Sequence, residues 1–206
     1  MMAGLREKKK EQTRRRISEA ALRLFDERGY DAVTIAEVAE AAGVAKVTLL
    51  AYFSCKDSLV LDAVKEDLAA IVVGREEGRS PLDALREHYR RMASNGTGGM
   101  DVEELFTRIR VISSSPALLA GLQHAHASQR AELAAALAST LPGDGLVAQL
   151  MAAQISAAVT TLQEAFFHRL STGVSLEEAG RLLGADVDLA FDLLQHGFSS
   201  PQGEKS

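Results

Sequence analysis

The sequence predicts an all-α protein of about nine helices, and three observations lead to this fold class. Apolar residues recur with helical spacing along most of the 206 residues. No stretch alternates between apolar and polar residues in the way that a half-buried strand does. There are only four prolines, which leaves room for long helices. The composition, 47% hydrophobic and 25% charged, is that of a globular protein and excludes a disordered or fibrous chain.

The first helix is predicted over residues 11–28. Ala21 and Leu24 follow Ile17 by four and seven positions, so the three residues share one face of a helix. Gly29 stands where a left-handed residue commonly ends a helix. We therefore expect a single amphipathic helix that stops just before Gly29.

Two short helices are predicted next, joined through a glycine turn. Thr34 and Glu37 have the spacing of a capping box, in which each side chain bonds to the other residue's backbone N–H. The helix that follows Thr34 is interrupted at Gly43, and a helical pattern resumes over residues 45–53. Two short helices joined in this way are the helix-turn-helix arrangement.

The rest of the chain predicts six longer helices. Ser54 with Asp57 and Ser175 with Glu178 have capping-box spacing at two of their starts. The predicted ranges are 55–73, 80–93, 101–112, 116–140, 146–170 and 175–197. The first of these would be about 28 Å long, enough to bridge two domains and to transmit a change between them.

These elements predict four segments. We expect a flexible basic arm over 1–10, a helix-turn-helix domain over 11–57, a regulatory and dimerisation domain over 58–200, and a disordered tail over 201–206. The first sixteen residues hold seven Lys or Arg against two acidic residues, although the whole chain has a net charge of −5. This asymmetry indicates a polyanionic partner at one end of the chain, and a solvated, frayed tail is the alternative.

Residues 11–64 resemble the DNA-binding domain of the TetR (tetracycline repressor) family of bacterial regulators. The order G-Y-x-x-x-T, A-x-x-A-G-V and T-L-x-x-Y-F-x-x-K-x-x-L is specific, because a chance match to all three parts is improbable. The residues that carry the resemblance are Ile17, Ala20, Ala21, Leu24, Phe25, Gly29, Tyr30, Thr34, Ile35, Ala39, Ala42, Gly43, Val44, Thr48, Leu49, Tyr52, Phe53, Lys56 and Leu59. The resemblance implies a DNA-binding regulator that acts as a homodimer.

The expected DNA contacts lie on the third short helix and beside it. They are Thr34, Ala45, Lys46, Val47, Thr48, Leu50, Ala51, Tyr52 and Lys56. We expect Lys46 and Thr48 to read base edges, and Lys56 to hold a phosphate together with nearby backbone N–H groups. For Tyr52 the resemblance implies a phosphate contact, and a place in the three-helix core is the alternative. At position 47 the family commonly has a polar residue or Gly, whereas this chain has Val47. At positions 50 and 51 it commonly has Tyr and then His or another polar residue, whereas this chain has Leu50 and Ala51.

The C-terminal region resembles the regulatory domains of the same family. Residues 104–118 are similar to the subgroup with acyl-CoA-like ligand-binding domains, which implies an effector pocket between helices. Candidate pocket residues, each of which could instead be plain core, are Tyr89, Met92, Leu105, Ile109, Ile112, Leu122, His126, Met151 and Ile155. The last two helices have wide apolar faces that suit a two-fold interface, with candidate residues Leu162, Phe166, Leu183 and Phe191, and burial inside one protomer is the alternative.

Together these features predict a cytoplasmic transcriptional regulator, most simply a repressor that an apolar or acyl-CoA-like effector releases from a pseudo-palindromic operator. An effector-independent DNA-binding or interaction module is the alternative. We find no signature of a nucleophile, a phosphate loop or a zinc site, and so expect no enzyme, cofactor or metal. No apolar run approaches the length of a membrane span, and the single cysteine, Cys55, is compatible with either a redox-sensitive or an inert thiol.

Overall fold

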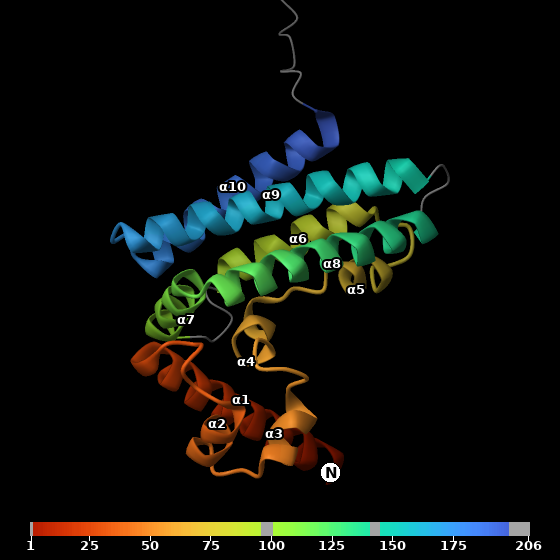
Figure 1. Cartoon of the computed structure of the whole chain (residues 1–206). Helices are drawn as coiled ribbons and strands as arrows, with labels where there is room; N and C mark the ends of the chain where they lie inside the picture. Colours follow the sequence, from red (N-terminus) through yellow and green to blue (C-terminus); the bar gives the residue numbers. More distant parts are fainter. Residues whose placement is uncertain (1, 96–100, 141–144, 198–206) are drawn as a thin grey trace, which may run out of the picture. The chain divides into compact units, whose positions relative to one another are not determined.

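The structure is a computed structural model that describes residues 2–95, 101–140 and 145–197 (Figure 1). Within these ranges the chain forms ten α-helices and one 3-10 helix, and it contains no strand, which confirms the predicted all-α class. The elements are α1 (Met2–Arg28), α2 (Ile35–Ala41), α3 (Lys46–Tyr52), α4 (Ser58–Leu61), η1 (Asp62–Val64), α5 (Leu68–Val73), α6 (Pro81–Asn95), α7 (Val102–Ser114), α8 (Pro116–Thr140), α9 (Gly145–Ser171) and α10 (Leu176–His196). The predicted tail over 201–206 lies outside the described residues.

The described residues form two compact units. Unit 1 comprises residues 2–65 and 101–125, and unit 2 comprises residues 66–95, 126–140 and 145–197. This division differs from the sequence-based boundary at residue 57, because α7 and the first part of α8 belong to the same unit as the helix-turn-helix. Of the described helices, α8 alone contributes residues to both units.

Unit 1 is built around the apolar face of α1. Ile17, Ala21 and Phe25 are at most 2% exposed, at the spacing that predicted a single buried face. Val38 of α2 and Leu49 of α3 are fully buried in the same core. Burying an aliphatic or aromatic side chain of this size contributes about 1.5–3 kcal/mol, so the short α2 and α3 are held mainly by this core.

Unit 2 packs α5, α6, α9, α10 and the second part of α8 around one core. Helix α10 approaches α6 closely at Gly180, where a Cβ atom would lie 2.9 Å from the carbonyl oxygen of Ala93. The guanidinium of Arg86 on α6 pairs with Asp188 (3.2 Å) and Asp192 (2.8 Å) of α10. Close backbone contact and ion pairs therefore hold α6 against α10.

Two predicted elements are wrong in extent. The segment expected to be a flexible arm, 1–10, is helical from Met2 onward and continues directly into α1. The helix predicted over 55–73 is broken into α4, η1 and α5, because Lys65 is extended and the side chain of Asp67 caps α5 by accepting from the N–H of Ala70 (2.8 Å). A continuous helix over 55–73 therefore cannot transmit a change between domains.

Helix α9 meets the length and composition criteria for a membrane span, so the expectation of no such segment is wrong on that test. Its most apolar 18-residue window has a mean hydropathy of 1.4, and 28% of this window is buried. The buried residues Ala148, Ala152, Ile155, Val159 and Leu162 recur every three or four positions and face the core of unit 2. A core helix meets the same criteria, and this spacing is that of a core helix.

Candidate DNA-binding surface

Helix α2 begins at a complete capping box. The N–H of Thr34 donates to the Glu37 carboxylate (2.7 Å), and the N–H of Glu37 donates to the Thr34 hydroxyl (3.3 Å), as the spacing predicted. Hydrogen bonds from the backbone and hydroxyl of Thr34, and then from Arg28, lower the pKa of the Glu37 carboxyl to about 2. The start of α2 is therefore fixed by groups that remain ionised at neutral pH.

A glycine turn joins α2 to α3. Gly43 has a φ of 63°, in the left-handed region that glycine adopts without a Cβ clash. The N–H groups of Gly43 and Val44 donate to the carbonyls of Glu40 (3.0 Å) and Ala39 (2.9 Å), which closes the end of α2. Ala45 is extended and starts α3 without a side-chain cap.

Helix α3 presents most of its side chains to solvent. Of its seven residues only Leu49 is buried, whereas Val47 is 75% exposed and Leu50 is 42% exposed. Of the other predicted contacts, Ala45, Lys46 and Ala51 are exposed, and Thr48 and Tyr52 are half-buried. The exposed face is largely apolar with one cation at its start, which is a combination that can contact thymine methyl groups and base acceptors in a major groove.

The C-terminal end of α3 is held by Arg14, a residue that the sequence analysis did not single out. Its guanidinium donates to the carbonyl oxygen of Tyr52 (2.7 Å), pairs with Asp62 (2.6 Å) and lies 4.4 Å from the centre of the Phe53 ring. These contacts satisfy a helix-end carbonyl and fix α3 against α1. Tyr52 itself packs against the core of unit 1, as in the core alternative.

Lys56 occupies another helix position than the one from which its phosphate contact was predicted, and that contact stays a prediction. It lies before α4 rather than in the first turn of a long helix, because α4 starts at Ser58. Its ammonium donates to the carbonyl oxygen of Tyr30 (2.5 Å) and lies 4.1 Å from the centre of the Tyr30 ring. The Tyr30 hydroxyl bonds to Asp57, and burial and then this carboxylate raise the pKa of the Tyr30 hydroxyl. Lys56 thus stabilises the connection between α1 and α4.

Helix α7 supports this surface through two arginines that the sequence analysis also missed. Arg108 is 1% exposed, and it donates to the carbonyl oxygen of Val60 in α4 (2.8 Å) and to Glu104 (2.8 Å). Arg110 forms two 2.8 Å hydrogen bonds to the carboxylate of Asp26 in α1. An Arg at i, i+4 from a Glu usually indicates an exposed pair, so burial of Arg108 could not be read from spacing.

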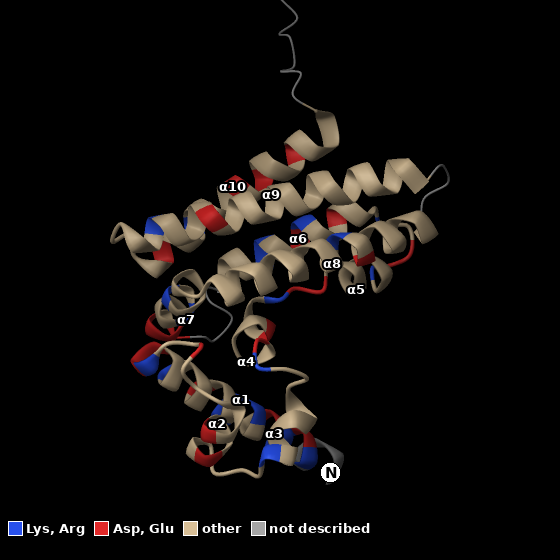
Figure 2. Ribbon diagram, viewed as in Figure 1, with Lys and Arg blue, Asp and Glu red and all other residues tan. Residues whose placement is uncertain are grey.

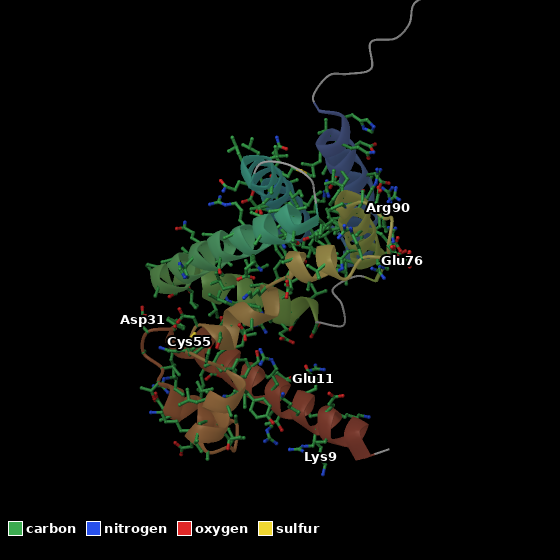
Figure 3. All side chains as sticks on the ribbon, turned by 90° about the vertical axis from the view of Figure 1, so that its right-hand side faces the viewer. Lys9, Glu11, Asp31, Cys55, Glu76 and Arg90 are labelled. Carbon is green, nitrogen blue, oxygen red and sulfur yellow. The ribbon has the colours of Figure 1, made fainter. Side chains whose placement is uncertain are left out.

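Cys55 follows α3 and is exposed, and it is labelled in Figure 3. The neighbouring Ser54 hydroxyl lies 3.9 Å from its sulfur, and the predicted Ser54 cap is not formed. The described residues contain no group of three or more His, Cys, Asp or Glu side chains that could hold a metal ion.

The nine candidate pocket residues are divided between the units. Leu105, Ile109, Ile112 and Leu122 belong to unit 1, and Tyr89, Met92, His126, Met151 and Ile155 belong to unit 2. Within unit 2, Tyr89 and Ile155 are buried, Met151 is half-buried against the same core, and Met92 is 39% exposed. The nine residues therefore do not line one pocket inside either unit.

A polar cluster that the sequence analysis did not find borders the core of unit 2 at Tyr89. The Tyr89 hydroxyl donates to the carboxylate of Glu66, and the side-chain amide of Gln129 donates to the Glu66 carbonyl oxygen (2.7 Å). Burial raises the pKa of the Glu66 carboxyl, although the bond from Tyr89 opposes the shift. This cluster places a carboxyl group beside Tyr89, which is one of the pocket candidates.

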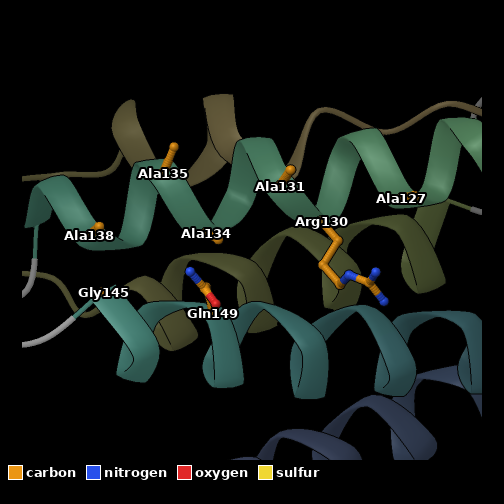
Figure 4. Close-up of a pocket in the computed structure, with 8 residues that line it drawn as sticks. All are labelled: Ala127, Arg130, Ala131, Ala134, Ala135, Ala138, Gly145 and Gln149. Atoms are coloured by element: carbon orange, nitrogen blue, oxygen red, sulfur yellow. The ribbon is translucent and has the colours of Figure 1, made fainter.

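A groove of about 590 Å³ lies between α8 and α9 within unit 2 (Figure 4). Its lining residues are Ala127, Arg130, Ala131, Ala134, Ala135, Ala138, Gly145 and Gln149, and none of them is a candidate pocket residue. The side chains of Arg130 and Gln149 point into the space between the two helices. The groove is open along its length and most of its lining residues are exposed, so it is a surface feature rather than an enclosed cavity.

The candidate interface residues also separate into two kinds. Leu162 is 5% exposed and Phe191 is 1% exposed, so both belong to the core of unit 2 and the prediction that they face a second protomer is wrong. Phe166 and Leu183 are half-buried. The spacing of the apolar residues in α9 and α10 predicted that Leu162 and Phe191 are buried. It did not show whether the same protomer or a second protomer covers them.

The capped α2, the glycine turn and the exposed α3 define a helix-turn-helix protein. Residues 17–63 match the family described as bacterial regulatory proteins of the tetR family, and residues 79–199 match the MftR C-terminal domain. Because the second match alone covers more than half of the chain, the chain belongs to the TetR family of bacterial transcriptional regulators.

Individual relatives agree with this assignment. The chain is 31% identical over 124 residues to the HTH-type transcriptional regulator TcmR of Streptomyces glaucescens, and the alignment covers 57% of this chain and 55% of TcmR. The chain thus spans about half the length of this relative. In fold it is similar to NalD, the secondary repressor of the MexAB-OprM multidrug efflux pump in Pseudomonas aeruginosa (16% identity, TM-score 0.52, 91% of this chain and 97% of NalD). It is also similar to Salmonella enterica GusR (19% identity, TM-score 0.52, 90% of this chain and 95% of GusR).

Proposed function

We propose that the protein is a homodimeric transcriptional repressor that binds a pseudo-palindromic operator through α3. The observation that carries this proposal is the exposed face of α3, on a helix whose two ends are fixed by the glycine turn and by Arg14. Exposing Val47 and Leu50 contributes nothing to the packing of unit 1. A recognition helix, in contrast, must present an exposed face to the major groove. Lys46 and Thr48 then read base edges, and Val47 and Ala51 contact thymine methyl groups. The first backbone N–H groups of α2 bind a phosphate beside Thr34, whose own N–H and hydroxyl donate to Glu37.

We propose that two protomers associate through α9 and α10. Leu150 on α9 is 56% exposed, and Leu189 and Leu193 on α10 are 61% and 38% exposed. Large apolar side chains exposed on two adjacent helices suit a two-fold interface. Leu189→Glu is expected to convert the dimer to monomers in sedimentation analysis, and Arg181→Glu, at an exposed position on the same helix, is the control.

We propose that unit 2 binds a largely apolar effector, which fits the resemblance to acyl-CoA-like ligand-binding domains. Tyr89, Met151 and Ile155 supply apolar surface in one core, and the half-buried carboxyl of Glu66, which bonds to Tyr89, offers one polar partner. Binding there would favour a conformation with lower DNA affinity. Such a protein acts in the bacterial cytoplasm, where its DNA is.

Helix α8 is the proposed route of this regulation, in place of the broken segment 55–73. Its residues 126–140 lie in unit 2 and its residues 116–125 lie in unit 1. At Gly121 a Cβ atom would lie 3.2 Å from both Asp57 and Leu61, so α8 packs directly on the segment that follows α3. A shift of α8 would therefore displace the segment that supports α3.

The test is a selection of duplexes from a random-sequence library with the purified protein, followed by titration of the selected duplex with and without small-molecule extracts of bacterial cells. The proposal predicts a selected sequence with two related half-sites whose centres are about one helical turn, 34 Å, or a multiple of it apart. It also predicts that an extract weakens binding. Binding that no extract changes would favour the effector-independent module, and failure to select any sequence would contradict the proposal.

A further inference from the structure

The N-terminal turns of α1 carry exposed Lys and Arg side chains that take no part in the contacts described above for unit 1. Residues 6–12 are all exposed, and Arg6, Lys8, Lys9 and Lys10 have no ion pair or side-chain hydrogen bond within the described residues. Figure 2 shows Lys and Arg at this end of α1 and at the start of α3, and the same turns of α1 also contain Glu7 and Glu11. Figure 3 shows the turn that bears Lys9 extending clear of the other helices of unit 1.

These cations are not evenly distributed around the helix. At 3.6 residues per turn, Arg6 and Lys10 lie within about 20° of the direction of Ile17, whereas Lys8 points to the opposite side. Ile17 marks the face of α1 that is buried against the helix-turn-helix. From residue 13 onward this face of α1 contacts the rest of unit 1. Nearer the N-terminus, at Arg6 and Lys10, the same face is exposed and basic.

The position of this basic face is set by Arg14. Its bond to the carbonyl oxygen of Tyr52 places α1 beside the C-terminal end of α3 at that point. From Arg14 the helix continues for eight residues to Arg6, about 12 Å along its axis. When α3 lies in a major groove, an element that runs past its end meets the sugar–phosphate backbone at the groove's edge.

We propose that Arg6 and Lys10 bind phosphates that flank the α3 contact, so that the basic end of α1 is a second DNA-binding surface. This inference rests on the proposed function, because it needs α3 to dock on DNA. Phosphate contacts of this kind position a protein without reading sequence, so the surface should add equally to specific and non-specific affinity. It also supplies cations to a chain whose net charge is −5.

The test compares two charge-matched double variants. R6Q/K10Q removes two cations from the proposed face, and K8Q/R15Q removes two from the opposite side of the same helix, where Arg15 is 66% exposed. Gln is close to Lys and Arg in helix propensity, so far-UV circular dichroism should show α1 intact in both. Binding is measured by fluorescence anisotropy between 50 and 300 mM salt. The probes are a duplex of about 40 base pairs selected with the wild-type protein and a random duplex of equal length.

The proposal predicts that R6Q/K10Q lowers the slope of log K against log salt by about 3 to 4, close to 0.9 for each of four phosphate contacts in the homodimer. Affinity for both duplexes should fall roughly tenfold or more, and K8Q/R15Q should change the slope by less than about 1. Equal slopes in the two variants, or an unchanged slope in R6Q/K10Q, would overturn this inference alone. Failure of the wild-type protein to bind either duplex would instead overturn the proposed function.

Discussion

Replacing Arg108 should destabilise unit 1, which contains the helix-turn-helix, although this residue lies outside that motif on α7. The side chain is 1% exposed and supplies hydrogen bonds to Val60 and Glu104. Arg108→Ala leaves the Val60 carbonyl without its side-chain donor and opens a cavity. Breaking a fully buried ion pair costs about 3–5 kcal/mol, and the 23% exposure of the Glu104 side chain places this pair at the lower end of that range. Because the Nε atom of Arg108 has no hydrogen-bond partner among the described residues, removing the charge also relieves some desolvation, and we expect a loss of about 3 kcal/mol.

Arg108→Met separates packing from hydrogen bonding. Met fills most of the same volume and needs no partner, so we expect a loss of about 1–2 kcal/mol, chiefly from the Val60 carbonyl. Arg15→Ala removes an exposed i, i+4 pair with Glu19 in the same unit and should have no measurable effect. The three variants thus separate burial from pairing.

The assay is native-state hydrogen exchange followed by mass spectrometry, because the two units need not unfold together. A loss of about 3 kcal/mol corresponds to roughly a hundredfold faster exchange of the most protected amides in α1, α4 and α7. Peptides from α9 and α10 serve as the internal control and should change little. Unchanged exchange in unit 1 of Arg108→Ala would refute the reasoning, and so would an equal change in α9 and α10.

Three further substitutions test other parts of the structure. Gly180→Ala should cost about 1–3 kcal/mol in unit 2, because its Cβ would lie 2.9 Å from the Ala93 carbonyl oxygen, and a thermal midpoint equal to wild type would contradict this close approach. Glu66→Gln should make unit 2 more stable than wild type at pH 7–8, because the Gln side-chain oxygen can still accept the hydrogen bond from the Tyr89 hydroxyl. Burial raises the pKa of Glu66, so its ionisation destabilises the folded state as pH rises, and the difference should vanish below about pH 4.3; a gain that persists at low pH would exclude this cause. Thr34→Ala should lower the stability of unit 1 by about 0.5–2 kcal/mol through loss of the cap, and Thr34→Ser should restore most of it in the same denaturation assay.

The parts of the fold that depend on neighbouring residues could be predicted from the sequence. The Thr34 capping box, the left-handed Gly43 and the buried face of α1 involve residues within one or two turns of each other. Such local geometry follows from spacing and residue type. The exposure of Val47 followed from the same reasoning, because α3 is too short to bury more than one face.

The errors concern interactions between distant segments. The apolar period runs without Gly or Pro through residues 55–73, and only the extended Lys65 and the Asp67 cap show where the helix ends. Lys56 was expected in the first turn of a helix, and the hydrogen bond from its ammonium to Tyr30, 26 positions earlier, could not be read from local spacing. The period of α9 and α10 also could not separate Leu162, which is covered by its own chain, from residues free to meet a second protomer.

The central claim is that the solvent face of α3 is the surface that binds DNA, and Val47 gives its most direct test. Val47 is 75% exposed, so Val47→Asp should leave the thermal midpoint and the circular dichroism spectrum unchanged. Within a major groove the new carboxylate would meet phosphate charge and lose hydration, so we expect the anisotropy-measured affinity for the selected duplex to fall at least about a hundredfold. An affinity within about threefold of wild type, in a variant as stable as wild type, would show that DNA is bound elsewhere.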